Sequence, residues 1–511
     1  MTSAADLADY SQVTTAMSNQ PDNLSPRTPT DAVPPLEAVP TMSVPAPPPV
    51  SAGRAGEAMA DPTYRRILVL AAPLILSSTG MMIMQVIDAI FLARYSKEAM
   101  AASVTAGLAG FSACALFIGL AGYTSVFVAQ YIGAGRPERV GASVWQGIWF
   151  SFAAGLAVAL IGLTGTWLFR QAGHEAAVWP LEAAYFRILC FGGVFVVLSC
   201  ALSGFFSGRG DNLTLGVVQL AGVAVNALVS WILIFGRWGF PELGAVGAAV
   251  GTVIGQAVVC LGLGVLLLLP RYGLSLGTWN ARFEWALLRR LMRYGVPAGV
   301  RLLIEVTVWT LFTSFIGRLG AEPQAATGIV FRINALAFFP LFGIGMAIST
   351  LVGQGQGMRR PDLGQKATWR GLLVSQIWMF SCAALFVLMP RPLLAVFHEQ
   401  GGPDAAAWAR TLEMGVVLLR FVAAYCLVDA VNVVVVSALQ GAGDTKWTLM
   451  ASSLLYAIFL ATLWSLQRDG AGIYALWTTA TLFILVLALV MLARFHGGRW
   501  KTMTVVEPTV V

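Results

Sequence analysis

Three acidic side chains stand within long apolar stretches of the sequence: Asp88, Glu305 and Asp429. An ionisable group near the centre of a bilayer costs about 2.5–3.5 kcal/mol on insertion scales, so each acid is expected to have a partner or a function. Because desolvation penalises the charged form, such a carboxyl group can hold a proton near neutral pH. It can also bind Na⁺ together with neighbouring hydroxyl and carbonyl oxygens. The sequence therefore predicts cation-coupling sites at these three acids, with Glu305 and Asp429 as candidate Na⁺ ligands.

Polar residues near these acids could complete such sites. Gln85 lies one helical turn before the first acid, Thr307 two residues after the second, and Asn432 three residues after the third. Asn226 and Thr252 stand at membrane depth in two further apolar stretches. For these two residues, hydrogen bonding between helices and a part in a site remain open alternatives.

A structural ion pair is the alternative to a titrating acid. Arg301 precedes Glu305 by four residues, the spacing at which opposite charges meet on one helix face. Arg332 and Arg420 lie in other apolar stretches and are further candidate partners. Asp88 has no basic residue within a turn, so it is the acid that we most expect to titrate.

The elements that must position these residues are membrane-spanning helices. Of the 511 residues, 57% are hydrophobic and only 11% are charged, and the mean hydropathy is +0.75. A soluble protein needs roughly a quarter of its residues charged to cover its surface. Twelve apolar runs are long enough to cross a hydrocarbon core of about 30 Å. We place them near 67–93, 99–132, 143–169, 181–206, 213–236, 244–270, 295–317, 325–356, 371–389, 413–438, 447–466 and 472–493.

The loop charges predict how these helices are oriented. An even number of spans puts both termini on one face. When the Lys and Arg residues are assigned to alternate loops, most fall on that face, among them Arg136, Arg139, Arg290, Arg360 and Lys366. The positive-inside rule then places both termini in the cytoplasm.

An internal repeat divides the spans into two sets of six. At an offset of 224 residues, the segment 128–138 lies over 352–362, and Pro73 lies over Pro297. A second block repeats at an offset of 233, as a modest insertion would give; it pairs 207–212 with 440–445. Because each set holds an even number of spans, the sequence predicts an all-α protein of two six-helix lobes. These lobes are related by a pseudo-two-fold axis along the membrane normal.

The resulting domain organisation has four parts. Residues 1–63 form a Pro-rich tail that cannot bury enough apolar surface to fold. The first lobe with its following linker covers 64–280, the second lobe covers 281–500, and a short tail covers 501–511.

Several classes of function are disfavoured. No GxxxxGK[ST], GxSxG or HExxH motif occurs, so neither an enzyme nor a cofactor is expected. The six cysteines show no CxxC spacing. Basic residues lie in short loops between apolar runs, which indicates membrane topology rather than binding to nucleic acid.

Together these features resemble the multidrug and toxic compound extrusion (MATE) family, closest to its NorM-like branch, over about residues 64–495. The residues that carry the resemblance are Pro73 fifteen positions before Asp88, the loop Gln130–Arg136, the stretch Phe235–Gly247, the core Ile304–Thr307, and Asp429 with Leu439–Thr445 downstream.

The resemblance implies a V-shaped pair of lobes that exports organic cations and drugs in exchange for H⁺ or Na⁺. By motif match, Glu305 and Asp429 fall on the acids of the second-lobe cation site. Asp88 falls on the first-lobe acid, with Asn226 and Thr252 on its polar partners. The position of Ser230 departs from the pattern, because NorM-like members often have an Asn there.

We therefore expect a monomeric antiporter of small cationic or amphiphilic substrates in a bacterial inner membrane. The alternative is a flippase of lipid-linked precursors from the same paired-lobe superfamily. Such a protein handles a pyrophosphate and should place several arginines in its cavity, whereas only Arg301, Arg332 and Arg420 lie deep in the spans.

Overall fold

The computed structural model describes residues 62–171, 173, 175–176, 178–397 and 405–507, and the predicted N-terminal tail lies almost wholly outside them. The described residues form helices and no strand. The longer helices are α2 (Tyr64–Tyr95), α3 (Lys97–Gly122), α4 (Thr124–Gly133), α5 (Glu138–Gly162), α7 (Trp179–Phe191), α8 (Gly193–Arg209), α9 (Asn212–Phe235), α10 (Ala245–Leu267), α12 (Trp285–Gly317), α13 (Ala321–Gly357), α14 (Pro361–Leu388), α16 (Ala405–Ala442), α17 (Thr445–Arg468) and α18 (Ile473–His496). Short helices α6 (Gly165–Gln171), α11 (Pro270–Leu276), α15 (Pro390–Ala395), η1 (Arg237–Gly239) and η2 (Arg499–Thr502) complete the chain.

The helices confirm the predicted all-α membrane architecture. Within the described ranges, eleven helical segments are long and apolar enough to cross a membrane, with α3 and α4 counted as one. The pair α7 and α8, bent by 40°, brings the number to twelve if it is one span. The bend falls at Gly192, where a Cβ would overlap Val253 of α10. A glycine there lets the two halves of a broken span pack closely on their neighbour.

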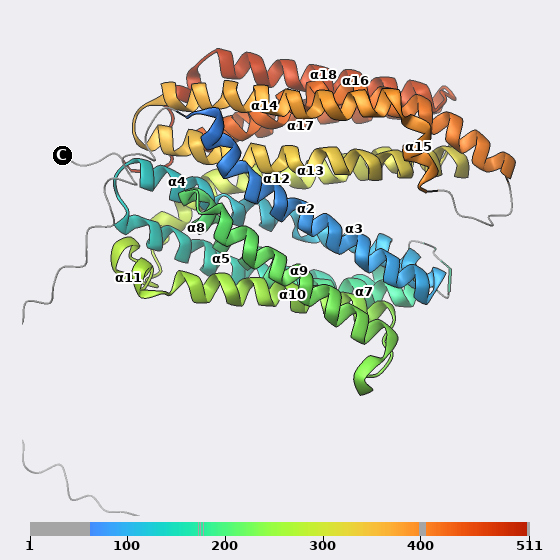
Figure 1. Ribbon diagram of the computed structural model, residues 1–511, viewed down its shortest axis with the longest axis horizontal. Coiled ribbons are helices and arrows are strands. Elements are labelled where there is room, and N and C mark those ends of the chain that lie inside the picture. Colours follow the sequence, from blue (N-terminus) through green and yellow to red (C-terminus); the bar gives the residue numbers. More distant parts are fainter. Residues whose placement is uncertain (1–61, 172, 174, 177, 398–404, 508–511) are drawn as a thin grey trace, which may run out of the picture. The chain divides into compact units, whose positions relative to one another are not determined.

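The two sets of helices are assembled in equivalent ways. In the first half α2 packs on α9, and in the second half α12 packs on α17. Between the halves, α2 packs on α13 while α3 packs on α12. The 224-residue offset carries α2 onto α12 and α3 onto α13, so these two contacts exchange under the pseudo-two-fold. In Figure 1 the first half runs from blue to green and the second half from yellow to red.

At one end of the bundle, the two halves are joined by reciprocal backbone contacts. A Cβ on Gly133 would overlap the backbone oxygen of Gln354, and a Cβ on Gly357 would overlap the backbone oxygen of Gln130. Gly133 and Gly357 are 224 positions apart, and so are the two glutamines. The repeated loops found in the sequence therefore meet each other across the pseudo-two-fold axis. We call this end the sealed end.

Hydrogen bonds reinforce the sealed end with the same symmetry. The Gln130 side-chain amide donates to the Gly441 carbonyl at 3.0 Å, and that of Gln354 donates to the Gly208 carbonyl at 3.1 Å. Both ends of the described chain lie here as well, because Arg370 donates to the carbonyl of Pro62 and Tyr131 donates to Glu507.

The last residues of the chain cross the sealed end as a strap, which we define as Thr504–Glu507. The Val505 amide donates to the side-chain oxygen of Gln130 at 2.8 Å. The Glu507 carboxylate lies within ion-pair distance of Arg136 and Arg139, which flank the start of α5, and of Arg290 on α12. The strap therefore bridges the first and second halves, although the sequence predicted only a tail here.

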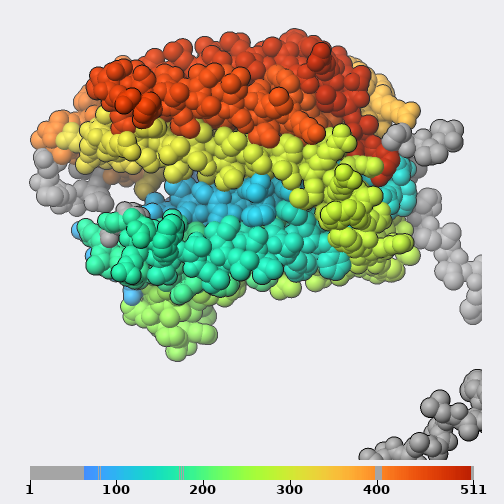
Figure 2. All heavy atoms as spheres, turned by 180° about the vertical axis from the view of Figure 1, so that it is seen from behind, coloured from blue at the N-terminus to red at the C-terminus, as the bar shows by residue number. Residues whose placement is uncertain are grey.

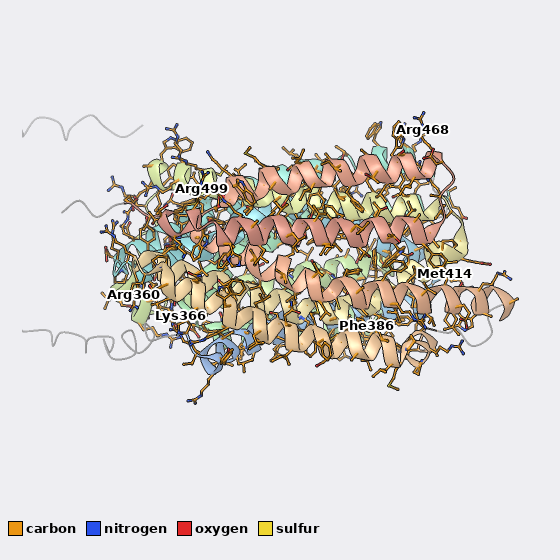
Figure 3. The ribbon with its side chains drawn as sticks, turned by 90° about the horizontal axis from the view of Figure 1, so that it is seen from above. Arg360, Lys366, Phe386, Met414, Arg468 and Arg499 are labelled. Carbon is orange, nitrogen blue, oxygen red and sulfur yellow. The ribbon has the colours of Figure 1, made fainter. Side chains whose placement is uncertain are left out.

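At the opposite end the halves separate. Figure 2 shows the surface hollowed there, between the yellow helices of the second half and the teal helices of the first. Of the labelled side chains in Figure 3, Arg360, Lys366 and Arg499 lie toward the sealed end, whereas Arg468 lies toward the other end. The cytoplasmic assignment of the sealed end stays a prediction.

Candidate functional site: carboxyl groups within the spans of both halves

The first acid, Asp88, lies in a polar network inside the first half. It is 8% exposed, and its Oδ2 accepts from Asn226 of α9 at 3.5 Å and from Thr252 of α10 at 3.4 Å. Asn226 also lies 3.4 Å from the Thr252 hydroxyl and 3.5 Å from the Ser230 hydroxyl. The structure thus brings together three helices and the side chains that the sequence had placed at membrane depth.

A stripe of glycines on α10 makes this network possible. Gly247, Gly251 and Gly255 recur every four residues and so share one helix face. Cβ atoms on them would clash with the backbone of Leu233, the Ser230 hydroxyl and the Asn226 side chain, respectively. Because the backbones of α9 and α10 approach this closely, the short Thr252 side chain reaches both Asn226 and Asp88. The sequence analysis missed this small-xxx-small pattern, which is a recognised signal of close helix packing in membranes.

Two oxygens of the network have no donor. Asp88 Oδ1 and Asn226 Oδ1 are buried and accept no hydrogen bond from the described residues. A buried acceptor without a donor costs free energy, and a proton or a cation that binds there relieves this cost. The oxygens at this site therefore fit a bound H⁺ or a hard cation.

The acids of the second half are arranged differently. Arg301 forms an ion pair with Glu305 at 2.9 Å within α12, as the four-residue spacing predicted. Asp429 of α16 accepts from Asn432 at 3.3 Å. The described residues contain no group of three or more His, Cys, Asp or Glu side chains that could hold a metal ion. Sodium binding by Glu305 and Asp429 remains a prediction.

Two of the predicted polar partners lie elsewhere. Thr307 is exposed and donates to the Leu303 carbonyl of its own helix at 2.7 Å. Two residues correspond to about 200° around a helix, so Thr307 points away from the face that carries Glu305. The described structure therefore does not bring Thr307 to Glu305, and a part for Thr307 in a cation site stays a prediction. Gln85 is exposed on α2 and makes no hydrogen bond to Asp88 in the described structure.

The remaining deep arginines do not neutralise the acids. Arg332 of α13 and Arg420 of α16 are exposed, and neither forms an ion pair with a described residue. Of the three arginines considered from the sequence, Arg301 alone pairs with one of the three acids in the described structure.

This fold and these sites define a polytopic helical membrane protein of two equivalent halves, each with acidic side chains within its spanning helices. The family model described as MatE matches residues 73–232 and 297–463. The chain therefore belongs to the MatE family. The two matched segments begin 224 residues apart, which is the offset of the internal repeat.

Curated relatives and solved structures agree with this assignment. The chain is 25% identical over 456 residues to the Probable multidrug resistance protein NorM of Mesorhizobium japonicum, covering 86% of this chain and 95% of that protein. It is 28% identical to the protein of the same name from Pseudomonas putida, covering 86% and 94%. A MOP superfamily transporter from Pyrococcus furiosus superposes with a TM-score of 0.78 at 19% identity, covering 87% of this chain and 97% of that chain. A multidrug resistance MATE family transporter in an outward-facing conformation superposes with a TM-score of 0.77 at 19% identity. The match covers 87% of this chain and 97% of that chain.

Proposed function

We propose that this protein is a secondary active exporter that moves small amphiphilic or cationic organic molecules out of the cell in exchange for H⁺ or Na⁺. The observation that carries the proposal is the buried Asp88 carboxyl group with one unpartnered oxygen, held by three helices of which one, α2, also packs on the other half. The names of the NorM relatives support export of drugs and a bacterial inner membrane as the location.

The two halves supply the moving parts. The structure is closed at the sealed end, which we assign to the cytoplasm from the loop charges, and parted at the other end. In this conformation the acids bind the coupling cation from outside, and substrate leaves. Opening of the sealed end then exposes the gap to the cytoplasm. Because substrate and cation stabilise different states, each lowers the affinity for the other by the same factor. One charge moving through 100 mV supplies about 2.3 kcal/mol.

The flippase alternative is less well supported by the arrangement of charges. A lipid pyrophosphate carries several negative charges and calls for a cluster of arginines. In the described structure Arg301 is paired with Glu305, and Arg332 and Arg420 are on different helices. No grouping of these three side chains provides such a cluster.

The decisive experiment is transport in proteoliposomes with proton and sodium gradients imposed separately. Ethidium uptake into the lumen should follow one of the two gradients and stop when that gradient is dissipated. Asp88→Asn should reduce gradient-driven transport at least tenfold while leaving ethidium binding in detergent intact. If ethidium moves at the wild-type rate with both gradients absent, the coupled-exporter proposal is wrong.

A further inference from the structure

One face of α13 packs on the first half along the sealed part of the molecule. The Phe339 carbonyl accepts from Ser78, Gly343 lies against Ile75, Thr350 donates to the Ser207 carbonyl, and Gly357 lies against Gln130. The four α13 residues are spaced by four, seven and seven positions, so they share one helix face. This face is the wall that the second half presents to the first.

The same face continues toward the open end and carries Arg332. Arg332 precedes Phe339 by seven residues, or two turns, and Gly328 precedes Arg332 by four. Arg332 is exposed and forms no hydrogen bond or ion pair with any described residue. A Cβ built on Gly328 would meet nothing within 4 Å. Beyond Phe339 this face therefore no longer packs on the first half, and Arg332 lies about 10 Å further along the helix.

An arginine at this depth belongs in water rather than in lipid. It is eleven residues, or about 16 Å, from the start of α13. At a central position a lipid-facing arginine would be costly, so charged residues in spans face a polar cavity. The position of Arg332 on the wall between the halves satisfies this requirement.

The equivalent face of the first half, on α3, is apolar. On α3, Gly119 packs against Gly299 of α12, and its helix face continues to Phe111, Leu108 and Val104. These three side chains are 46%, 45% and 54% exposed. Leu108 is the repeat equivalent of Arg332, 224 positions earlier, so the same place in the frame is apolar in one half and cationic in the other.

We propose that Arg332 binds an acidic group of the exported substrate, and that the apolar body of the substrate lies against Val104, Leu108 and Phe111. The substrate class is then an amphiphile with one carboxylate, sulfonate or phosphate group, including zwitterions. A planar guanidinium binds such groups through two parallel hydrogen bonds. A substrate with only positive charge, such as ethidium, lacks this interaction and is expected to bind more weakly than a zwitterion of the same size. This inference deepens the proposed function and rests on it.

Rhodamine B and its ethyl ester test this assignment, because they share a cationic ring system and differ in one free carboxylate. Binding of each dye to the purified full-length protein in detergent is measured by fluorescence anisotropy, and transport is measured in proteoliposomes. In the wild type, rhodamine B should bind more tightly than the ester. Arg332→Gln should raise the Kd and the KM for rhodamine B about tenfold, as expected for loss of one charge-assisted pair. The values for the ester should stay within twofold or improve. Arg332→Lys should restore part of the affinity.

Arg420→Gln is the matched control. Arg420 shares a face of α16 with Leu427, which lines a groove against Gln376 and Ile377 of α14. Removal of the Arg420 charge should leave the Kd and the KM of both dyes unchanged. Equal loss of both dyes in Arg332→Gln, or no loss of rhodamine B, overturns the assignment of Arg332. If the dyes bind as expected but no gradient drives either across the membrane, the proposed function fails while the binding role of Arg332 stands.

Discussion

The two halves share a helical frame but differ in the residues that occupy the positions equivalent to the first-half polar network. The first-half network uses Asp88 on α2 and Asn226 on α9. Their repeat equivalents, 224 and 233 positions later, are Phe312 and Phe459. These two rings stack with centroids 6.1 Å apart, and Phe459 stacks on Phe483 of α18 at 4.6 Å. Asp88 and Asn226 thus each have an aromatic ring at the equivalent position of the second half.

The same exchange of small or polar residues for aromatic ones determines how α9 packs on α10 and how α17 packs on α18. α10 and α18 both begin directly after a glycine, Gly244 and Gly472, and this register carries Gly255 onto Phe483. In the first half, the glycines of α10 let α9 approach so closely that the Asn226 side chain lies against Gly255. In the second half, aromatic rings hold α17 and α18 apart and fill the space. One half therefore keeps a buried polar network, whereas the other has a packed aromatic core and its acids lie on α12 and α16.

Filling the glycine stripe should have the largest effect. Gly251→Val places side-chain atoms where the Ser230 hydroxyl now lies, so α9 and α10 must separate. Overpacking of this kind costs about 1–3 kcal/mol, and the separation also removes Thr252 from Asp88. We expect ethidium transport to be abolished and the thermal unfolding temperature in detergent to fall.

Gly264→Val on the same helix is the control, because a Cβ there meets no atom within 4 Å. It should leave both transport and stability near wild type. Normal transport in Gly251→Val would show that the close approach of α9 and α10 does not position the site.

Neutralising an acid should change the stability of the protein differently in the two halves. Asp88 has no basic partner among the described residues, so Asp88→Asn removes a carboxyl group whose ionised form is buried and unpaired. It should leave the unfolding temperature unchanged or higher. Glu305→Gln leaves Arg301 as an unpaired charge. We expect it to cost about 2 kcal/mol, less than the 3–5 kcal/mol typical of a fully buried pair, because the Glu305 side chain is 28% exposed.

The double variant Arg301→Gln/Glu305→Gln checks the reason for this difference. It removes both charges and should recover most of the stability lost in Glu305→Gln, as measured by thermal unfolding monitored by size-exclusion chromatography. Equal destabilisation by Asp88→Asn and Glu305→Gln would mean that the two halves hold their acids in the same way.

A smaller effect is expected at the strap, where the halves are joined. Burial alone would raise the pKa of Glu507, but hydrogen bonds from its own backbone and Tyr131, together with Arg290, hold it below the ordinary value of 4.5. The strap contacts are therefore present at neutral pH and are lost as the pH falls through that lowered pKa. Glu507→Gln at pH 7 should raise the open population of the sealed end about threefold, since such half-exposed pairs contribute about 0.5–1 kcal/mol.

Spin labels at Glu138→Cys in the first half and Asp362→Cys in the second would report this opening as a longer inter-label distance. Both positions are exposed at the sealed end. In the wild type, the fraction of molecules with this longer inter-label distance should increase only at acidic pH. Identical distance distributions for wild type and Glu507→Gln at neutral pH would exclude the strap as a latch.

Much of the fold could be predicted from the sequence, because membrane spans and internal repeats can be recognised directly in the order of residues. Apolar runs predicted the helices, and the 224-residue offset predicted which of them are equivalent. The pairing of Arg301 with Glu305 followed from spacing on one helix. The stripe Gly247–Gly251–Gly255 was also readable but was overlooked. The strap was not predictable, because the docking of a short non-helical segment depends on Gln130 and Arg290, which come from distant helices and meet only after folding.

The smallest effect is expected at the predicted polar partner of Glu305. Thr307 donates to its own helix and faces away from Glu305, so Thr307→Val should change ethidium transport by less than twofold. Its exposed surface and satisfied hydroxyl also predict a stability change within about 0.5 kcal/mol. Thr252→Val is the matched change in the first half, where the hydroxyl donates to Asp88 at 3.4 Å. Thr252→Val should slow coupled transport severalfold, whereas comparable losses from both variants would place Thr307 back in the second-half site.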